Sequence, residues 1–313
     1  MRMARRSFVG AAGSLVATAA IGEPPRPTGT KGEESVAWPG ASVLDGGRRG
    51  YVDTPLGQVH YRSMGEGIPL LLLHESASFL VQFAHVQPLF AAMGIRSVAL
   101  DRPGHGLSDA PREALSAEGF ADNLPHVLDA LGLDTVAVAG NHTGAAVAAA
   151  FTHRHPDRVS CLIMHGALLY TAKERKHALS LAPWNQRLRR DGTHLNDHFE
   201  HALVLSDGRS SLDSAQWSTI AYFLSGEHGW DGPRAAFGYD MERAVREIIR
   251  PTLLISNTEQ ENADNLMAAR ILDLRPDFLY HKFEGGHFSH TSMIYDDPQA
   301  WVDVVAPFVR THS

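Results

Sequence analysis

The chemistry of this 313-residue chain is clearest between residues 134 and 150, where a histidine stands at the tip of a sharp turn. The segment reads as a short buried strand, then Gly140-Asn141-His142-Thr143-Gly144, then a helix of small residues. A strand that turns directly into a helix needs a very small residue on each side of the tip, because a larger side chain would collide with the strand or the helix. This is the G-x-S-x-G pattern of a nucleophile elbow, with His142 in the place of the serine.

The His142 side chain is compatible with three kinds of behaviour. Neutral imidazole is a fair nucleophile near pH 7, so His142 could attack an acyl carbonyl and form an adduct that water hydrolyses. It could instead form an acid–base pair with His287 and move protons without a covalent intermediate. In the third interpretation the elbow takes no part in a reaction and the pocket only binds a ligand. The backbone N–H of Thr143 is well placed to stabilise an oxyanion.

The segments around the elbow predict a parallel, doubly wound α/β sheet. Apolar runs at residues 70–73, 97–100, 160–164 and 252–256 read as buried strands, and a hairpin precedes them at residues 51–62. Helices are predicted between these strands, including a single helix that ends near Met93 and another at residues 117–131. Apolar strands that alternate with helices pack as a parallel sheet covered on both faces.

Several motifs, in this order, resemble those of the α/β-hydrolase superfamily. They are HESAS at residues 74–78, DRPGHGLSD at 101–109, the GNHTG elbow, HPDRV at 155–159 and EGGHFSH at 284–290. The resemblance runs from about residue 51 to residue 309, leaving out the middle of the chain. It departs from the usual pattern at His142, where serine is usual, and at Glu75, where glycine is common. It implies an α/β-hydrolase fold, a mostly parallel doubly wound sheet with a helical cap insertion.

The middle of the chain, residues 167–249, breaks the alternation of strands and helices and is rich in aromatic residues. The resemblance implies that this insertion is a cap over the active site. The predicted core is then residues 49–166 and 250–313. The side chains expected to line an apolar, aromatic pocket are Ser76, Ser78, Trp184, Trp217 and Trp230.

The resemblance places the catalytic imidazole in the loop after the last strand, at His287. The acid that orients this imidazole is expected just after residue 256. Counting forward from the preceding strand favours Gln260, which cannot carry charge, whereas counting back from His287 favours Glu259. We choose Glu259 because an anionic partner would fix the tautomer and stabilise an imidazolium, and Glu261 is the alternative acid.

The turn after His74 is expected to supply the second oxyanion donor, beside the N–H of Thr143. The N–H of Glu75 or of Ser76 fits this role, and we choose Glu75. A serine nucleophile displaced from the elbow to Ser76 or Ser78 is an alternative, although nothing in the spacing orients either hydroxyl.

The first 20 residues resemble a twin-arginine export signal. Arg5-Arg6 precedes an uncharged stretch of small and apolar residues, and Ala17-Thr18-Ala19 offers a cleavage site of small residues. The stretch is too short and too weakly apolar to span a bilayer. Residues 21–48 are rich in Pro, Gly and Glu and read as a linker. We expect a periplasmic or secreted protein without a membrane span after processing.

Charge, cysteine and histidine content argue against several classes of partner. The formal net charge of −7 argues against a nucleic-acid partner. The single cysteine, Cys161, excludes an internal disulfide framework and reads as a buried thiol. His194, His198 and His201 share one face of a predicted helix and could hold zinc. No acid or base motif accompanies them, so we expect neither a metal nor an organic cofactor.

Taken together, these features predict an exported enzyme of α/β-hydrolase fold that hydrolyses an ester, lactone or other activated carbonyl bond. The substrate is expected to be an apolar or aromatic small molecule. One alternative is a cofactor-free lyase or isomerase that uses His142 and His287 for proton transfer. Another is a non-catalytic ligand-binding protein on the same fold. Neither the substrate nor the oligomeric state can be derived from the sequence.

Overall fold

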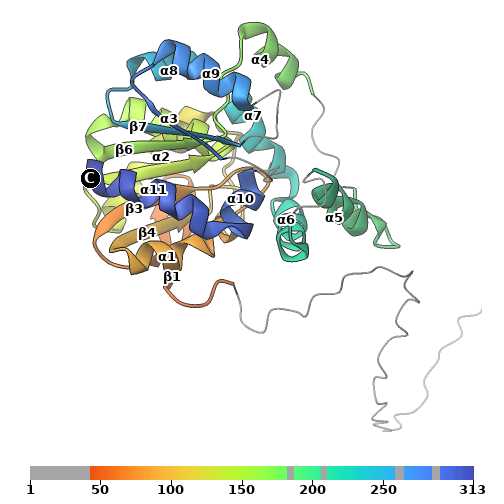
Figure 1. The fold of residues 1–313 in the computed structure, drawn as a ribbon. Coiled ribbons are helices and arrows are strands. Elements are labelled where there is room, and N and C mark those ends of the chain that lie inside the picture. The colour runs from red at the N-terminus through yellow and green to blue at the C-terminus, as the bar shows by residue number, and fades with distance from the viewer. Residues whose placement is uncertain (1–42, 182–186, 206–209, 258–263, 284–289) are drawn as a thin grey trace, which may run out of the picture. The chain divides into compact units, whose positions relative to one another are not determined.

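The structure is a computed structural model that describes residues 43–181, 187–205, 210–257, 264–283 and 290–313 (Figure 1). The predicted export signal and most of the predicted linker lie outside the described residues. Within the described ranges, no helix combines the length and the apolar composition that a membrane span requires.

An eight-stranded sheet forms the centre of the described chain, in the order β1-β2-β4-β3-β5-β6-β7-β8. β1 and β2 form an antiparallel hairpin, β2 is antiparallel to β4, and the remaining neighbours are parallel. The predicted mostly parallel sheet is confirmed. The strands are β1 (Arg48–Thr54), β2 (Gly57–Met64), β3 (Ile68–Leu73), β4 (Ile95–Leu100), β5 (Val136–Asn141), β6 (Val159–His165), β7 (Thr252–Asn257) and β8 (Leu279–Phe283).

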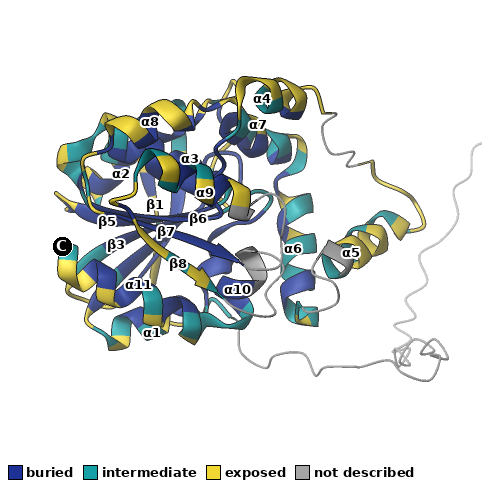
Figure 2. Cartoon of the chain, turned by 45° about the horizontal axis from the view of Figure 1, so that its top comes forward, coloured by how far each residue is buried: buried dark blue, intermediate teal, exposed yellow. Residues whose placement is uncertain are grey.

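Helices cover both faces of the sheet (Figure 2). One face carries α1 (Val86–Ala92) and α11 (Pro298–His312), which pack against each other, with α10 (His290–Asp296) beside α11. The other face carries α2 (Ala117–Ala130), α3 (Thr143–Arg154), α8 (Met241–Glu247) and α9 (Asp264–Leu274). Alternate leucines of β3 enter the two cores: Leu71 packs towards α2 and α3, and Leu72 packs towards α1 and α11.

The predicted single helix that ends near Met93 is wrong. The chain forms a short 3-10 helix, η1 (Leu80–Phe83), and then the separate helix α1. Pro88 favours the break, because proline has no N–H to donate and fits best in the first turn of an α-helix, although α2 and α11 contain Pro125 and Pro307 further along. α1 begins at Val86, shortly before Pro88.

Between β6 and α8 lies a group of helices, which we call the cap helices. They are α4 (Ala172–Leu179), α5 (Thr193–Leu205), α6 (Leu212–Leu224), η3 (Gly226–Trp230) and α7 (Asp231–Gly238). α7 packs on α2 and α3 of the core, and α5 packs on α6. Two side-chain contacts also join cap to core: Arg270 donates to Glu174 from α9 to α4, and the Tyr295 hydroxyl donates to Asp213 from α10 to α6. The cap helices are therefore joined to helices on both faces of the sheet.

Cys161 lies fully buried in β6. Burial raises the pKa of its thiol to about 11. This confirms the predicted buried thiol, and because the thiolate is the reactive form, Cys161 is chemically inert near neutral pH.

Candidate active site

The turn between β5 and α3 has the backbone of a nucleophile elbow. β5 ends at Asn141, α3 begins at Thr143, and His142 joins them with φ 47° and ψ −105°. His142 is the one residue other than glycine with a positive φ in the part of the chain that the structure describes. A conformation of this kind costs a non-glycine residue about 1–3 kcal/mol, and such strain clusters at functional sites.

Two glycines make this turn possible. A Cβ added to Gly140 would lie 2.1 Å from the carbonyl oxygen of Gly144, and one added to Gly144 would lie 2.0 Å from the carbonyl oxygen of Leu73. Both distances are far below any van der Waals contact. The tip is also tied to the next strand, because the His142 N–H donates to the His165 carbonyl at 2.8 Å.

The turn after β3 brings Glu75 to the same edge of the sheet. The Glu75 N–H donates to Gln82 Oε1 at 3.1 Å, so the predicted oxyanion donor already has an acceptor within the chain. The carboxylate reaches across to the elbow, where Glu75 Oε2 accepts from Asn141 Nδ2 at 3.2 Å. This hydrogen bond fixes which way the Asn141 amide faces, and its buried Oδ1 has no partner among the described residues. Thr143 is the first residue of α3, so its N–H has no acceptor within the helix.

Arg102 brings a buried positive charge to this turn. Its side chain lies 5.5 Å above the Phe120 ring, and its Nη2 donates to Ser76 Oγ at 2.7 Å and to the Glu75 carbonyl at 3.3 Å. Nε and Nη1 are buried without a partner among the described residues. Burial lowers the pKa of Arg102 to about 9, and the Glu75 carboxylate opposes that shift. The carboxylate and the guanidinium therefore attract each other across the site.

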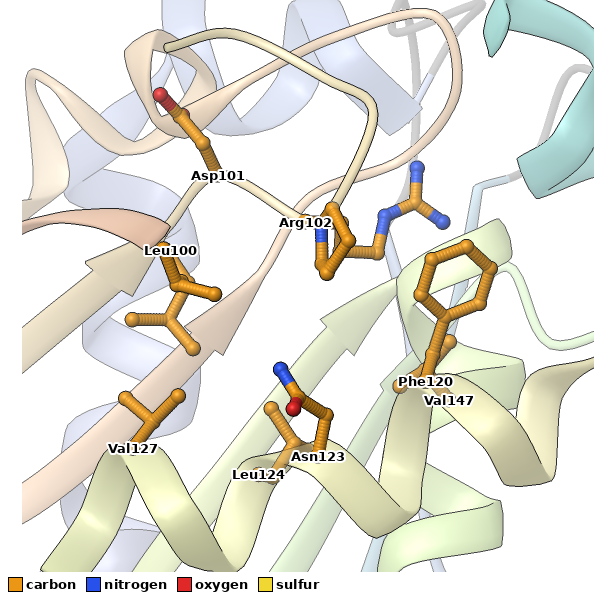
Figure 3. A pocket seen from close by; sticks show the side chains of 10 residues that line it. Leu100, Asp101, Arg102, Phe120, Asn123, Leu124, Val127 and Val147 are labelled. Carbon is orange, nitrogen blue, oxygen red and sulfur yellow. The ribbon is translucent and has the colours of Figure 1, made fainter. Parts of the chain in front are cut away.

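Figure 3 shows Arg102 at the rim of a small internal cavity, with its guanidinium pointing away from Asn123 and Leu124. The cavity volume is about 10 Å³. A cavity of that size has room for roughly one water molecule. It is therefore too small to be the substrate site.

Two buried histidines complete the polar cluster. His74 Nε2 accepts from the Arg102 N–H at 3.0 Å, so the proton sits on Nδ1, which donates to the Glu75 carbonyl at 2.6 Å. His105 Nε2 lies 3.5 Å from Ser76 Oγ. Burial, with the Arg102 charge nearby, lowers the pKa of both imidazoles well below the usual value, so both are neutral near pH 7.

The two serines of this turn have different surroundings. Ser78 is buried, and its hydroxyl donates to the Phe79 carbonyl at 3.4 Å. Ser76 is oriented by Arg102 and His105, which the sequence did not foresee. A Cβ on Gly232 of α7 would lie 1.9 Å from Ser76 Oγ, so the cap backbone occupies the space that an acyl group on Ser76 would need. This packing argues against a nucleophile displaced to Ser76.

The predicted aromatic residues of the cap fall in different places. Trp217 of α6 packs edge-on against Phe79 with 5.9 Å between ring centroids, and Trp230 of η3 packs against Phe237 at 5.9 Å. Trp184 lies outside the described residues. So do His287, Glu259 and Glu261, and their roles stay predictions.

The histidines of α5 face other rings. His198 stacks on Tyr222 at 3.9 Å, and His194 lies edge-on to Phe223 at 5.3 Å. Burial lowers the pKa of His198 to about 4. Among the residues that the structure describes, no group of three or more His, Cys, Asp and Glu side chains is arranged to hold a metal ion.

Comparison with protein families agrees with this geometry. Residues 68–292 match the family model of the alpha/beta hydrolase fold, which is most of the chain. The chain belongs to the α/β-hydrolase fold family.

Two curated members of this family illustrate how partial the sequence similarity is. The chain is 40% identical over 119 residues to 2-hydroxy-6-oxononadienedioate/2-hydroxy-6-oxononatrienedioate hydrolase 1 of Dechloromonas aromatica (strain RCB), covering 35% of this chain and 39% of that protein. It is 35% identical over 107 residues to epoxide hydrolase 2 of Siraitia grosvenorii, covering 34% of each. The matches thus span well under half of these relatives.

Solved structures of the α/β-hydrolase fold match nearly the whole described chain. An esterase from Exiguobacterium antarcticum aligns with TM-score 0.66 and 18% identity, covering 83% of this chain and 98% of that one. The enol-lactonase from Burkholderia xenovorans LB400 aligns with TM-score 0.64 and 18% identity, covering 83% and 100%. At such identities the likeness shows the fold alone.

Three residues of the site were missed from the sequence. Asn141 is part of the elbow motif, but its bond to Glu75 depends on how two turns meet. Gln82 lies seven residues after Glu75, and nothing in its surroundings marks it as an acceptor for that N–H. Arg102 belongs to the DRPGHGLSD motif, whose Asp101 braces the fold by accepting from the N–H groups of Leu80 and Leu107, and the motif gave no sign that the arginine turns towards Ser76.

Proposed function

We propose that this chain is an exported hydrolase that cleaves an ester, lactone or other activated carbonyl bond in an apolar or aromatic small molecule. The observation that carries the proposal is the conformation of His142. A residue other than glycine is held at positive φ at the tip of a strand-to-helix turn, with a glycine on each side that cannot take a side chain. Such strain persists where the surrounding structure imposes it, and it supports a role for His142 at the nucleophile's position.

The relatives support the reaction class. Curated relatives include epoxide hydrolases and 2-hydroxymuconate semialdehyde hydrolase, and structural neighbours include an esterase and an enol-lactonase. These names share the addition of water to a small molecule. In the proposed mechanism the neutral imidazole of His142 attacks the carbonyl carbon, and the negative charge on oxygen is received by the N–H of Thr143.

His287 is the proposed general base and acid, and Glu259 or, alternatively, Glu261 orients it. His287 takes the proton released when His142 bonds to the carbonyl carbon and gives it to the leaving group. Water then attacks the acyl adduct, the bond between the acyl carbon and the imidazole nitrogen breaks, and the acid is released. Neither a metal nor an organic cofactor takes part in this scheme.

A second candidate function is proton transfer by His142 and His287 in a lyase or isomerase. One observation favours it: the Glu75 N–H, which was the chosen oxyanion donor, donates to Gln82 instead. Acyl transfer depends strongly on such donors, since removing one costs about 10²–10³ in kcat. Proton transfer does not depend on them in the same way.

The two functions are separated by a screen of ester, lactone and carbon–carbon bond substrates against the wild type and the His142→Ala variant. For hydrolysis we expect turnover by the wild type, incorporation of ¹⁸O from labelled water, and an acyl adduct on His142 in quenched samples. Product without incorporated oxygen or adduct would support the lyase or isomerase. A His142→Ala variant with unchanged turnover would contradict both.

Export is the remaining part of the proposal. Residues 1–20 are proposed as a twin-arginine signal cut near Ala19 or Ala20, and residues 21–48 as a linker to the core at 49–166 and 250–313. Expression with Arg5 and Arg6 both changed to Lys tests this. The wild type is expected in the periplasmic or secreted fraction with a new N-terminus near residue 20, and the double variant in the cytoplasm at full length.

A further inference from the structure

The Glu75 carboxylate reaches the elbow from the turn after β3. Glu75 follows β3 and contacts Asn141, the residue immediately before His142, at 3.2 Å. Resemblance to the family suggested a role for the Glu75 amide, but that amide donates to Gln82. The part of Glu75 that reaches the elbow is its side chain.

The backbone of Glu75 is anchored on both sides, which holds the side chain in place. Its N–H donates to Gln82 Oε1, and its carbonyl accepts from the Ser78 N–H, from His74 Nδ1 and from Arg102 Nη2. A group held by this many hydrogen bonds loses little further entropy when it meets a substrate. Glu75 is therefore preorganised at the elbow.

The negative charge of Glu75 is offset by a positive charge at the site. Among the described residues, the charged and titratable groups at the turn include the buried Arg102 guanidinium and two neutral histidines, His74 and His105. Glu75 and Arg102 attract each other, so a carboxylate is tolerated in this partly buried position. A carboxylate beside a carbonyl substrate is suited to accept a proton.

Asn141 joins this carboxylate to the elbow. Its Nδ2 donates to Glu75, which leaves Oδ1 turned away from the carboxylate and without a partner among the described residues, although the side chain is 1% exposed. Buried acceptors are normally satisfied by protein or by ordered water. The hydrogen bond from Asn141 Nδ2 therefore holds the Glu75 carboxylate beside the residue that precedes the elbow tip.

We propose that Glu75 is a catalytic general base that activates the water which releases the acyl group from His142. The water oxygen bonds to the acyl carbon, one water proton passes to the Glu75 carboxylate, and the bond from the acyl carbon to the imidazole nitrogen breaks. The Glu75 carboxylic acid then returns the proton to the departing imidazole. The inference rests on the proposed function, because it needs an acyl group on His142.

Diethyl pyrocarbonate tests this step without any knowledge of the substrate, because it places a carbethoxy group on histidine nitrogens. The full chain is modified, the excess reagent is removed, and the loss of the group from His142 is followed by peptide mass spectrometry. The variants are Glu75→Gln, which keeps the acceptor for Asn141 but is not basic, and Glu66→Gln in the exposed turn before β3. The exposed His177 of α4 serves as an internal control in every sample.

General-base assistance contributes about 10²–10⁴-fold to a reaction, so the carbethoxy group should leave His142 at least ~10-fold more slowly in Glu75→Gln than in the wild type. Loss from His177 should be the same in all three proteins, and Glu66→Gln should match the wild type throughout. Equal loss from His142 in the wild type and Glu75→Gln would overturn the role of Glu75 and leave the proposed function standing. Absence of any adduct on His142 would overturn both.

Discussion

Two turns meet at the carboxyl edge of the sheet, and they are built in opposite ways. The elbow between β5 and α3 is fixed by the absence of side chains, since neither Gly140 nor Gly144 has space for a Cβ. The turn after β3 is fixed by the presence of side chains, since Gln82 and Arg102 both bind the backbone of Glu75. The first turn is therefore under a steric constraint, whereas the second is under a polar one.

The difference separates the constraints on the backbone from those on the side chains. Steric constraints at the elbow act on the backbone and do not depend on which side chain stands at the tip. Polar constraints at the β3 turn are carried by side chains 7 and 27 residues away from Glu75. We therefore expect substitutions in the turn after β3 to change the chemistry of the site more than they change the fold.

The largest effect is expected from Gly144→Ala. The added methyl group would lie 2.0 Å from the Leu73 carbonyl oxygen, so β3 and α3 must move apart. We expect the free energy of unfolding to fall by more than about 3 kcal/mol, measured by urea denaturation. Gly238→Ala, at the end of α7, is the matched control, because a Cβ added there would have no neighbour within 4 Å. It should change the free energy of unfolding by less than about 1 kcal/mol. A mild effect of Gly144→Ala would show that the elbow is not sterically fixed.

The next largest effect is expected from Gln82→Met, which tests the polar constraint on the β3 turn. Gln82 is 1% exposed and accepts from the Glu75 N–H, which methionine cannot do. An unsatisfied buried N–H costs about 1–3 kcal/mol, and we expect a loss of stability in that range. Gln58→Met, on the exposed part of β2, should stay within about 0.5 kcal/mol of the wild type. Equal stabilities for the two variants would mean that the N–H finds water instead.

Arg102→Met tests the buried charge through the pH dependence of stability. Burial lowers the pKa of Arg102 to about 9 in the folded chain, well below the usual value that the guanidinium keeps in the unfolded chain. Between these values the unfolded chain binds more protons than the folded one, so the free energy of unfolding rises with pH. From pH 8 to pH 10 the wild type should gain about 1 kcal/mol relative to the variant, in urea titrations at each pH. Arg243→Met, at an exposed arginine, should follow the wild type, and parallel curves for all three would refute the assignment.

The smallest expected effect concerns the strain at the elbow tip. Glycine tolerates positive φ, whereas alanine is strained there by roughly 1–2 kcal/mol, partly offset by the greater freedom of glycine in the unfolded chain. His142→Gly should therefore be more stable than His142→Ala by about 0.5–1 kcal/mol in urea unfolding. The opposite order would mean that the tip residue relaxes out of the conformation described for His142.

The sequence predicted most of the fold because its signals are local or steric. Gly140 and Gly144 identify the elbow, and the apolar runs of β3 and β5 identify strands buried on both faces. Pro88 is consistent with a helix that begins at Val86, but Pro125 and Pro307 lie well inside α2 and α11, so a proline alone does not fix where a helix begins. These features need no knowledge of what lies nearby in space.

The chemistry of the site was predicted less completely because it depends on contacts between distant segments. The position of Glu75 was noted, but whether its amide or its carboxylate reaches the elbow depends on Gln82 and Asn141. The buried charge of Arg102 cannot be inferred from a motif that is usually structural. Glu259, Glu261 and His287 lie outside the described residues, so their assignments still rest on resemblance.

The most direct test of the central claim, that residue 142 occupies the nucleophile's position, is labelling by a fluorophosphonate probe with peptide mapping by mass spectrometry. The wild type should give no labelled serine, since Ser76 is covered by α7 and Ser78 is buried. The His142→Ser variant should be labelled at position 142, because the elbow would then present a hydroxyl beside the Thr143 N–H. Labelling of Ser76 or Ser78 in the wild type, or no labelling at position 142 of the variant, would contradict the claim.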